Sequence, residues 1–215
     1  MDISEINNNK LKRHPWEIVR RNQLLKIIKK HHINNLSYAD VGCGDLYVTK
    51  KLAKITKSEI YAVDKSLNID QKQTIHDKIT LLTNINQIAN NGIDRIILLD
   101  VLEHIEDDKE FVNQLYKLLK NNGLLIITVP AFNFLFSEHD QILKHHRRYS
   151  SRNLLSLFDN NYNIINKFYF FSSLFFIRFL QLILYKIGFK KIFKHTISQW
   201  KFSENNFITK LITIL

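Results

Sequence analysis

Two closely spaced glycines at the end of an apolar run constrain this chain more than any other feature. The run Leu36–Val41 leads into Gly42 and Gly44, two of only five glycines among 215 residues. Glycines after a strand let backbone N–H groups approach a ligand without interference from a Cβ atom. A second apolar run ends at Asp64, 24 residues after Asp40, where a carboxylate can accept hydrogen bonds from ribose hydroxyls. The pattern predicts a Rossmann-like nucleoside site.

Apolar runs and helical patterns alternate along the chain, which predicts a doubly wound, mostly parallel α/β sheet. The expected strands are Leu36–Val41, Glu59–Val63, Ile79–Thr83, Arg95–Leu99 and Gly123–Val129, with a candidate sixth at Tyr162–Phe171. The expected helices are residues 16–32, Tyr47–Ile55, Lys109–Leu119 and a short one at Leu154–Phe158. Asn121–Gly123 is expected to form the turn before the fifth strand. We therefore expect an N-terminal helix (1–35), an α/β core (36–171) and an apolar helical appendage (172–215).

The basic charge of the chain is concentrated near its end. Of the net charge of +11, the stretch from Tyr162 to Leu215 has eight Lys or Arg against one acid, and it holds 14 of the 25 aromatic residues. A basic, aromatic-rich stretch predicts contact with an anionic surface, either a membrane or a nucleic acid. The single cysteine, Cys43, excludes an internal disulfide and favours a reducing compartment. The polar N-terminus lacks the pattern of a signal peptide, so a cytoplasmic location is expected.

The apolar stretch at residues 168–187 is long enough for a membrane span but carries Arg178 near its centre. A central arginine costs about 2.5–3.5 kcal/mol on insertion scales, which argues against a span. The following residues place Phe189, Phe193 and Trp200 at helical spacing among lysines, as in a basic interfacial helix. We expect residues 168–215 to contact the inner face of the cytoplasmic membrane. The alternative is a helix that covers the sheet, with its lysines in solvent.

Four pieces of the chain, in order, resemble class I S-adenosylmethionine-dependent methyltransferases. They are the glycine loop (residues 40–46), Asp64, the strand and loop at 94–105, and the helix end and strand at 118–130. The resemblance covers residues 16 to about 171 and implies a seven-stranded, mostly parallel sheet that binds S-adenosylmethionine. One departure is Leu46, which stands where the third glycine of this loop is usual.

The resemblance also implies which residues bind the cofactor. Asp40, Gly42 and Gly44 would line the methionine moiety, and Asp64 would hold the ribose hydroxyls. Asp100 would face the methionine end, and the adenine would lie between Asn84 and Ile85. Trp16, Arg20 and Arg21 resemble the start of an N-terminal helix that closes over the cofactor.

Residues 136–150, the histidine-arginine segment, resemble the pattern H-D-x-x-x-x-H-x-R-R-Y of one methyltransferase subgroup, where this segment lies over the acceptor. An arginine can grip a phosphate or carboxylate, and an imidazole can act as a base. The candidate acceptor-binding residues are Asp140, Arg147, Arg148 and Tyr149, the last expected to pack. The candidate catalytic residues are His139, His145 and His104, with His139 or His145 as the base. Ser150 is expected to cap a helix.

The spacing of Asp100, Glu103 and His104 is also similar to a metal-binding motif of ubiquinone-pathway and small-RNA O-methyltransferases. We predict no resident metal, and a divalent ion on these three residues is the alternative interpretation. In place of the tetrad usual in methyltransferases of base amino groups, this chain has Val129–Phe132, which argues against DNA-base methylation.

Together these patterns predict methyl transfer to an oxygen of a lipid-linked, isoprenoid or envelope-glycan acceptor. Two alternatives stay open. An RNA methyltransferase would use the net positive charge to bind phosphates. A non-catalytic nucleoside-binding or membrane-scaffold protein would share the fold without the reaction.

Overall fold

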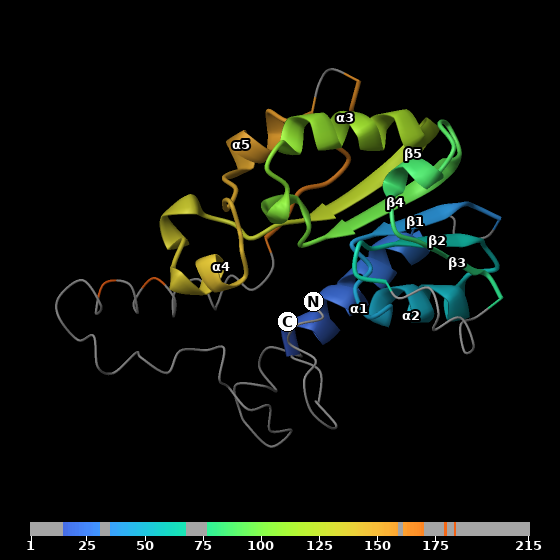
Figure 1. The fold of residues 1–215 in the computed structure, drawn as a ribbon, viewed down its shortest axis with the longest axis horizontal. Coiled ribbons are helices and arrows are strands. Elements are labelled where there is room, and N and C mark those ends of the chain that lie inside the picture. The colour runs from blue at the N-terminus through green and yellow to red at the C-terminus, as the bar shows by residue number, and fades with distance from the viewer. Residues whose placement is uncertain are drawn as a thin grey trace.

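The computed structural model describes residues 15–30, 35–67, 77–158, 161–169, 179 and 183. Five parallel strands form one sheet in the order β3-β2-β1-β4-β5 (Figure 1). The strands are β1 (Tyr38–Val41), β2 (Ile60–Val63), β3 (Ile79–Leu82), β4 (Ile93–Leu99) and β5 (Leu119–Thr128). The strand order reverses between β1 and β4, and such a switch point is where open α/β sheets bind their ligands.

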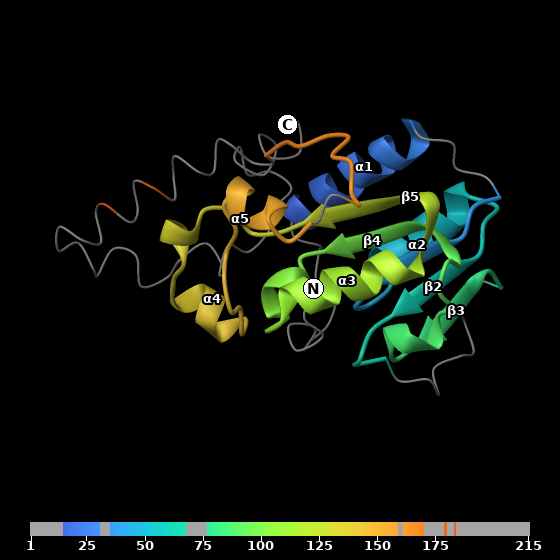
Figure 2. The same ribbon diagram turned by 90° about the horizontal axis from the view of Figure 1, so that it is seen from above.

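Helices cover both faces of this sheet (Figures 1 and 2). The α-helices are α1 (Pro15–Lys30), α2 (Tyr47–Ile55), α3 (Asp108–Leu118), α4 (Glu138–Ile142) and α5 (Ser151–Leu155). Three 3-10 turns are η3 (Ile85–Gln87), η4 (Leu102–His104) and η5 (Asn133–Leu135). On one face α3 buries Val112 and Leu115 against the sheet. On the other face α1 and α2 bury Leu24, Leu25 and Leu52. The parallel α/β architecture predicted from the sequence is confirmed.

The predicted elements of the core are present, with most ends shifted by one to three residues. Helix α2 lies at the predicted residues, and Ser150 caps α5 by accepting a hydrogen bond from the backbone N–H of Asn153 at 3.1 Å. The residues of the predicted turn at Asn121–Gly123 lie inside the bounds of β5, but they have no partner in β4, and Asn122 has a left-handed φ of 63°. There β5 pairs Leu119 with Ile93, and Leu124 with Arg95, so the extra residues of β5 form an irregularity in the ladder.

The candidate sixth strand is also not formed where the structure describes it, at residues 161–169. Residues 1–14 and 31–34 of the predicted N-terminal segment, and residues 172–215 apart from Phe179 and Ile183, lie outside the described residues. Among the described residues, no helix has the length and apolarity that a membrane span requires.

Candidate functional site

The three inner strands bring the aspartates singled out in the sequence to one edge of the sheet. Asp40 lies within β1, Asp64 follows β2, and Asp100 follows β4. Because β1 pairs in parallel with both β2 and β4, the carboxyl ends of these strands lie side by side. Residues predicted to bind one cofactor therefore share one edge, at the switch point of the sheet.

The glycine loop needs its glycines for two different reasons. Gly42 and Gly44 have φ angles of 75° and 52°, in the left-handed region that side chains disfavour. A Cβ atom on Gly42 would also lie 2.2 Å from Cγ2 of Val101, which follows β4. Leu46, in place of the third glycine, has a φ of 65° and packs with Cys43. The loop thus keeps the backbone path that glycine would give, at a cost of about 1–2 kcal/mol at Leu46.

Asp64 ties the end of β2 to the glycine loop. Its Oδ2 accepts a hydrogen bond from the backbone N–H of Gly44 at 2.9 Å, and its Oδ1 accepts one from the backbone N–H of Ser66 at 2.9 Å. The side chain is half-buried. The hydroxyl of Ser66 donates a third hydrogen bond, to Oδ1 at 2.5 Å. A carboxylate has about four lone-pair positions, so these three bonds orient it and leave one position, on Oδ2, for a ribose hydroxyl. This geometry supports the predicted role of Asp64.

Asp40 lies in β1 and Asp100 follows β4, the two strands on either side of the switch point. Asp40 is buried and accepts a hydrogen bond from Oγ1 of Thr49 at 2.6 Å; burial raises the pKa of its carboxyl to about 6. Asp100 has a φ of 52° and accepts a hydrogen bond from Oγ1 of Thr128, on β5, at 2.8 Å. A left-handed aspartate at a strand end is typical of functional sites.

Helix α1 places Arg20 over this edge. Its guanidinium forms an ion pair with Asp100, and the carboxylates of Glu17, Glu103 and Asp40 lie close enough to stabilise its charge. Burial nevertheless lowers the pKa of Arg20. The next residue, Arg21, lies over the ring of Tyr47 with 4.6 Å between guanidinium carbon and ring centroid. Arg20 and Arg21 thus connect α1 to the cofactor edge, while the side chain of Trp16 lies outside the described residues.

Asn84 and Ile85 lie where the resemblance predicts the adenine. The Asn84 side chain caps η3 by accepting a hydrogen bond from the backbone N–H of Asn86 at 2.9 Å. Ile85 is 9% exposed and packs in the core on the α3 side. Their contact with adenine stays a prediction, and the buried Ile85 offers little surface for it.

Backbone contacts join the two ends of the loop that carries the histidine-arginine segment. Ala131 and Tyr149 form a parallel bridge, the N–H of Phe132 donates to the carbonyl of Tyr149 at 3.0 Å, and the N–H of Tyr149 donates to the carbonyl of Pro130 at 2.9 Å. At its middle, the N–H of His146 donates to the carbonyl of Glu103 at 2.8 Å. These bonds fix the segment beyond the tips of β4 and β5, beside η4 (Figure 1).

Asp140 is the centre of this segment. It is fully buried, and its Oδ1 accepts hydrogen bonds from Nδ1 of His145 at 3.0 Å and Nε of Arg148 at 2.7 Å. Its Oδ2 accepts one from the backbone N–H of Ser137 at 2.9 Å. Burial alone would raise the pKa of Asp140, but the bonds from His145 and Arg148 outweigh it and hold the pKa well below its usual value. The carboxylate is therefore ionised, and its oxygens are hydrogen-bonded to groups of the protein.

Arg147 and Tyr149 tie the segment to the start of α3. Nη1 of Arg147 lies 2.8 Å from Oδ2 of Asp108, and its Nη2 donates to the carbonyl of Glu106 at 2.7 Å. The Tyr149 hydroxyl donates to the same Asp108 oxygen at 2.8 Å, and burial raises its pKa. Tyr149 packs, as expected. All four predicted acceptor-binding side chains thus have partners within the protein, and their contact with an acceptor stays a prediction.

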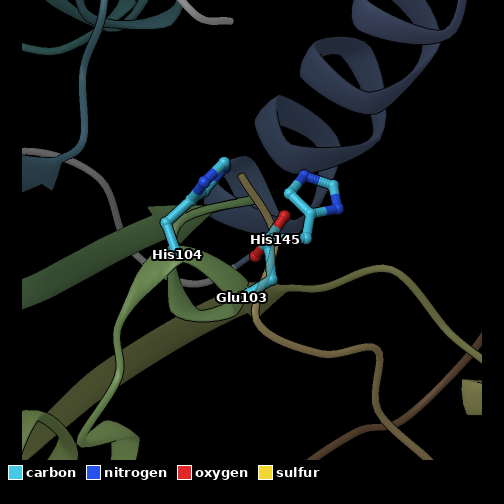
Figure 3. Close-up of side chains that lie close together, drawn as sticks. All are labelled: Glu103, His104 and His145. Atoms are coloured by element: carbon cyan, nitrogen blue, oxygen red, sulfur yellow. The ribbon is translucent and has the colours of Figure 1, made fainter. Parts of the chain in front are cut away.

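Glu103, His104 and His145 form a group (Figure 3). One ligand atom from each lies within 4.8 Å of the others, and the two imidazole rings meet edge to face with centroids 4.7 Å apart. Glu103 is 1% exposed and its Oε2 has no hydrogen-bond partner; burial raises the pKa of its carboxyl to about 7. The group joins η4 to the histidine-arginine segment. His139, the other predicted base, lies on α4 and is not part of it.

This group also fits a divalent metal ion better than the predicted set does. Asp100 of that set is held by Arg20 and Thr128, whereas His145 joins Glu103 and His104. One carboxylate and two imidazoles are donors that zinc and similar ions prefer over magnesium or calcium. The unpaired Oε2 of Glu103 is consistent with such a ligand. An ion held there would lower the pKa of a hydroxyl bound to it.

Comparison with known proteins agrees with this geometry. Residues 39–127 match the family model described as a methyltransferase domain. The chain carries a class I S-adenosylmethionine-dependent methyltransferase domain. The fold of the domain is similar to phosphoethanolamine N-methyltransferase 2 of Haemonchus contortus in complex with S-adenosyl-L-methionine. The TM-score is 0.59 at 18% identity, over 83% of this chain and 45% of that one.

Among curated proteins, the methyltransferase domain is similar to two enzymes named ubiquinone biosynthesis O-methyltransferase. The one from Rickettsia bellii is 28% identical over 153 residues, which cover 59% of this chain and 63% of the relative. The one from Rickettsia typhi is 29% identical over 127 residues, which cover 51% of this chain and 48% of the relative. The chain thus spans less than two thirds of the length of these relatives. S-adenosylmethionine is the cofactor of the domain, and its contact with the glycine loop and Asp64 stays a prediction.

Proposed function

We propose that the protein transfers the methyl group of S-adenosylmethionine to an oxygen atom of a small-molecule acceptor, with His145 as the base. The observation that carries this proposal is the hydrogen bond between His145 and the buried Asp140, beside the strand end that holds Asp100. The names of the two curated relatives also favour an oxygen acceptor.

The Asp140–His145 pair is suited to removing a proton. S-adenosylmethionine supplies an electrophilic methyl group on a sulfonium when bound. An ionised carboxylate only accepts hydrogen bonds, so Nδ1 of His145 carries the proton of this bond. In the neutral imidazole Nε2 is then unprotonated and can accept the proton of a hydroxyl. Asp140 holds this tautomer and stabilises the imidazolium that forms.

The proton balance of the reaction can be followed through these side chains. The acceptor oxygen forms its bond to the methyl carbon as the carbon–sulfur bond breaks, and its proton passes to Nε2 of His145. The ring of His104, which meets His145 edge to face, is exposed. His145 is the catalytic residue of this scheme and Asp140 a positioning residue.

The acceptor class is inferred from the composition of the chain. A basic, aromatic-rich stretch from Tyr162 onward supports an acceptor that is lipid-linked, isoprenoid or part of an envelope glycan. We propose that the protein works in the cytoplasm, at the inner face of the cytoplasmic membrane.

The test is methyl transfer from tritium-labelled S-adenosylmethionine into a membrane lipid extract, with total RNA as the competing acceptor. We expect label in the lipid fraction and a loss of kcat of about 100-fold or more in His145→Gln. Asp140→Asn is expected to lower kcat with little change in KM, because the amide no longer holds the tautomer of His145 that has an unprotonated Nε2. The exposed Glu106→Gln is the matched control. Cofactor affinity, measured by calorimetry, should be unchanged in all three variants.

Three outcomes would overturn the proposal. Full activity of His145→Gln would exclude His145 as the base. Label in RNA alone would show that the protein is an RNA methyltransferase. Absence of cofactor binding by the wild type would leave a non-catalytic protein. Loss of activity on adding a chelator, restored by zinc, would instead assign Glu103, His104 and His145 to a metal ion.

A further inference from the structure

Exposed apolar side chains of the described residues are gathered in one part of the chain. Nine large hydrophobic residues are exposed, and Tyr116 on α3 is the one of these that precedes residue 130. The other eight are Phe134, Ile142, Ile164, Ile165, Phe168, Tyr169, Phe179 and Ile183. Among them Ile142 is 76% exposed and Phe134 is 58% exposed. Single exposed apolar residues are ordinary, but a gathered set marks an interaction surface.

Ring contacts join residues of this part of the chain that are 37 and 45 positions apart in sequence. Phe132 stacks on Tyr169 with ring centroids 5.3 Å apart and planes 10° apart, and Phe134 meets Phe179 edge to face at 6.3 Å. Phe132 and Phe134 are themselves 5.7 Å apart. We call Phe132, Phe134, Tyr169 and Phe179 the aromatic patch. It joins the histidine-arginine segment to the basic stretch that follows Tyr162.

The backbone holds the patch in place at some cost. Phe132 has a φ of 64°, which costs a side chain of this kind about 1–3 kcal/mol. Its N–H donates to the carbonyl of Tyr149 at 3.0 Å, and its carbonyl accepts from the N–H of Leu135 at 2.9 Å. The same backbone contacts with Tyr149 close the loop that contains His145. Phe132 and Phe134 of the aromatic patch therefore lie in the same closed loop as His145.

The charge around the patch decides which partner it fits. Exposed Lys144, Arg152 and Lys167 lie in the same part of the chain, and from Tyr162 onward eight basic residues face one acid. A second copy of the chain, with a net charge of +11, would be repelled. Isoleucines such as Ile142 and Ile165 bury well in hydrocarbon but do not stack on nucleic-acid bases. Apolar side chains among cations match the interface of an anionic bilayer.

We propose that the aromatic patch, with Ile142, docks on the surface of an anionic lipid bilayer. Docking there would place the histidine-arginine segment at the membrane surface. An acceptor anchored in the bilayer would then reach His145 without leaving the bilayer. This last step rests on the proposed function, whereas the docking itself does not.

Vesicle flotation of the full chain tests the docking. The vesicles are phosphatidylcholine alone, or phosphatidylcholine mixed with phosphatidylglycerol in equal parts. We expect binding to the mixed vesicles, weakened at least about tenfold in the double variant Phe134→Ser with Ile142→Ser, because apolar side chains are lost from the interface. Both residues are exposed, so folding should not change. Tyr116→Ser, an exposed aromatic outside the patch, is the matched control and should bind like the wild type.

Unchanged binding of the double variant, or no preference for the anionic vesicles, would overturn the proposal. Competition by RNA with equal loss in the double variant would make the patch a base-stacking surface instead. His145→Gln should still bind vesicles, and the double variant should still bind S-adenosylmethionine in calorimetry. A failure of docking can therefore be told apart from a failure of the proposed reaction.

Discussion

The cofactor half of the site and the histidine-arginine segment hold their side chains by different means. In the cofactor half, Asp40, Asp64 and Asp100 lie at or just beyond strand ends, and the strand pairing sets their places. In the segment, Asp140 and Tyr149 are held by side-chain bonds to residues brought together by the fold. In the first arrangement Asp64 is half-buried and keeps hydrogen-bonding capacity for a ligand, whereas in the second the carboxylate of Asp140 is used inside the protein. The same residue types therefore have different roles in the two halves.

The largest effect is expected at Asp64. Asp64→Ala removes a carboxylate that is predicted to accept a hydrogen bond from the ribose and that accepts one from the backbone N–H of Gly44, each worth about 1.5–3 kcal/mol when charged. We expect the affinity for S-adenosylmethionine, measured by calorimetry, to fall at least about 100-fold. Glu59→Gln, at the opposite end of β2, should leave it unchanged. Equal affinity of Asp64→Ala and wild type would show that the position of Asp64 at the end of β2 does not make it a cofactor-binding residue.

Gly42→Ala should be the next largest effect. The new Cβ would meet Val101 at 2.2 Å, and alanine would also be strained at a φ of 75°. Together these costs should lower the free energy of unfolding by about 2–5 kcal/mol in urea denaturation. Adding Val101→Ala removes the clash but not the strain, so the double variant should recover part of the loss. No recovery would mean that backbone strain alone requires the glycine.

Glu103 lies where the two halves meet, and it should make stability depend on pH. Burial raises the pKa of its carboxyl to about 7 from 4.5, so the folded state binds the proton more tightly than the unfolded state. The stability that this proton confers is full below pH 4.5 and is lost as the pH rises toward 7.

Glu103→Gln has no such titration. Relative to the wild type it should gain about 2–3 kcal/mol between about pH 5 and about pH 8, measured by urea denaturation with a chelator present. A difference between the two proteins that is the same at both pH values would contradict this assignment.

The smallest effect is expected at Tyr149. Tyr149→Phe removes one hydrogen bond to Asp108, which keeps its contact with Arg147. We expect a loss of about 1 kcal/mol in the free energy of unfolding and no change in cofactor affinity. A large fall in cofactor affinity would mean that the two halves are coupled more closely than their separate bonding indicates.

The features that could be predicted from the sequence are those that depend on residues close together in the chain. The five strands, α2 and the Ser150 cap follow from local periodicity and capping, and the glycine loop follows from its backbone requirement. The residues of the turn expected at Asn121–Gly123 lie within the bounds of β5, but they have no partner in β4, and Asn122 has a left-handed φ of 63°. The local pattern indicated an irregularity there, but not that the strand begins four residues earlier than expected, at Leu119.

Contacts between distant residues could not be predicted in the same way. The ion pair of Arg20 with Asp100, and the meeting of Glu103 with His145, depend on how α1 and the histidine-arginine segment lie on the sheet. Asp140 was predicted to bind an acceptor, and nothing in its spacing indicates that it is fully buried. Burial of a polar residue depends on the partners that the fold provides.

The position of β1 in the sheet also affects how the protein folds. Tyr38 of β1 pairs with Arg95 of β4, so the strand that carries the glycine loop has a neighbour 57 residues later in the chain. Parallel pairs of this separation close long loops and form slowly. Until β4 is in place, one edge of β1 has no partner and Val101 cannot reach Gly42. The glycine loop, the most local pattern in the sequence, is therefore completed by a late, long-range step.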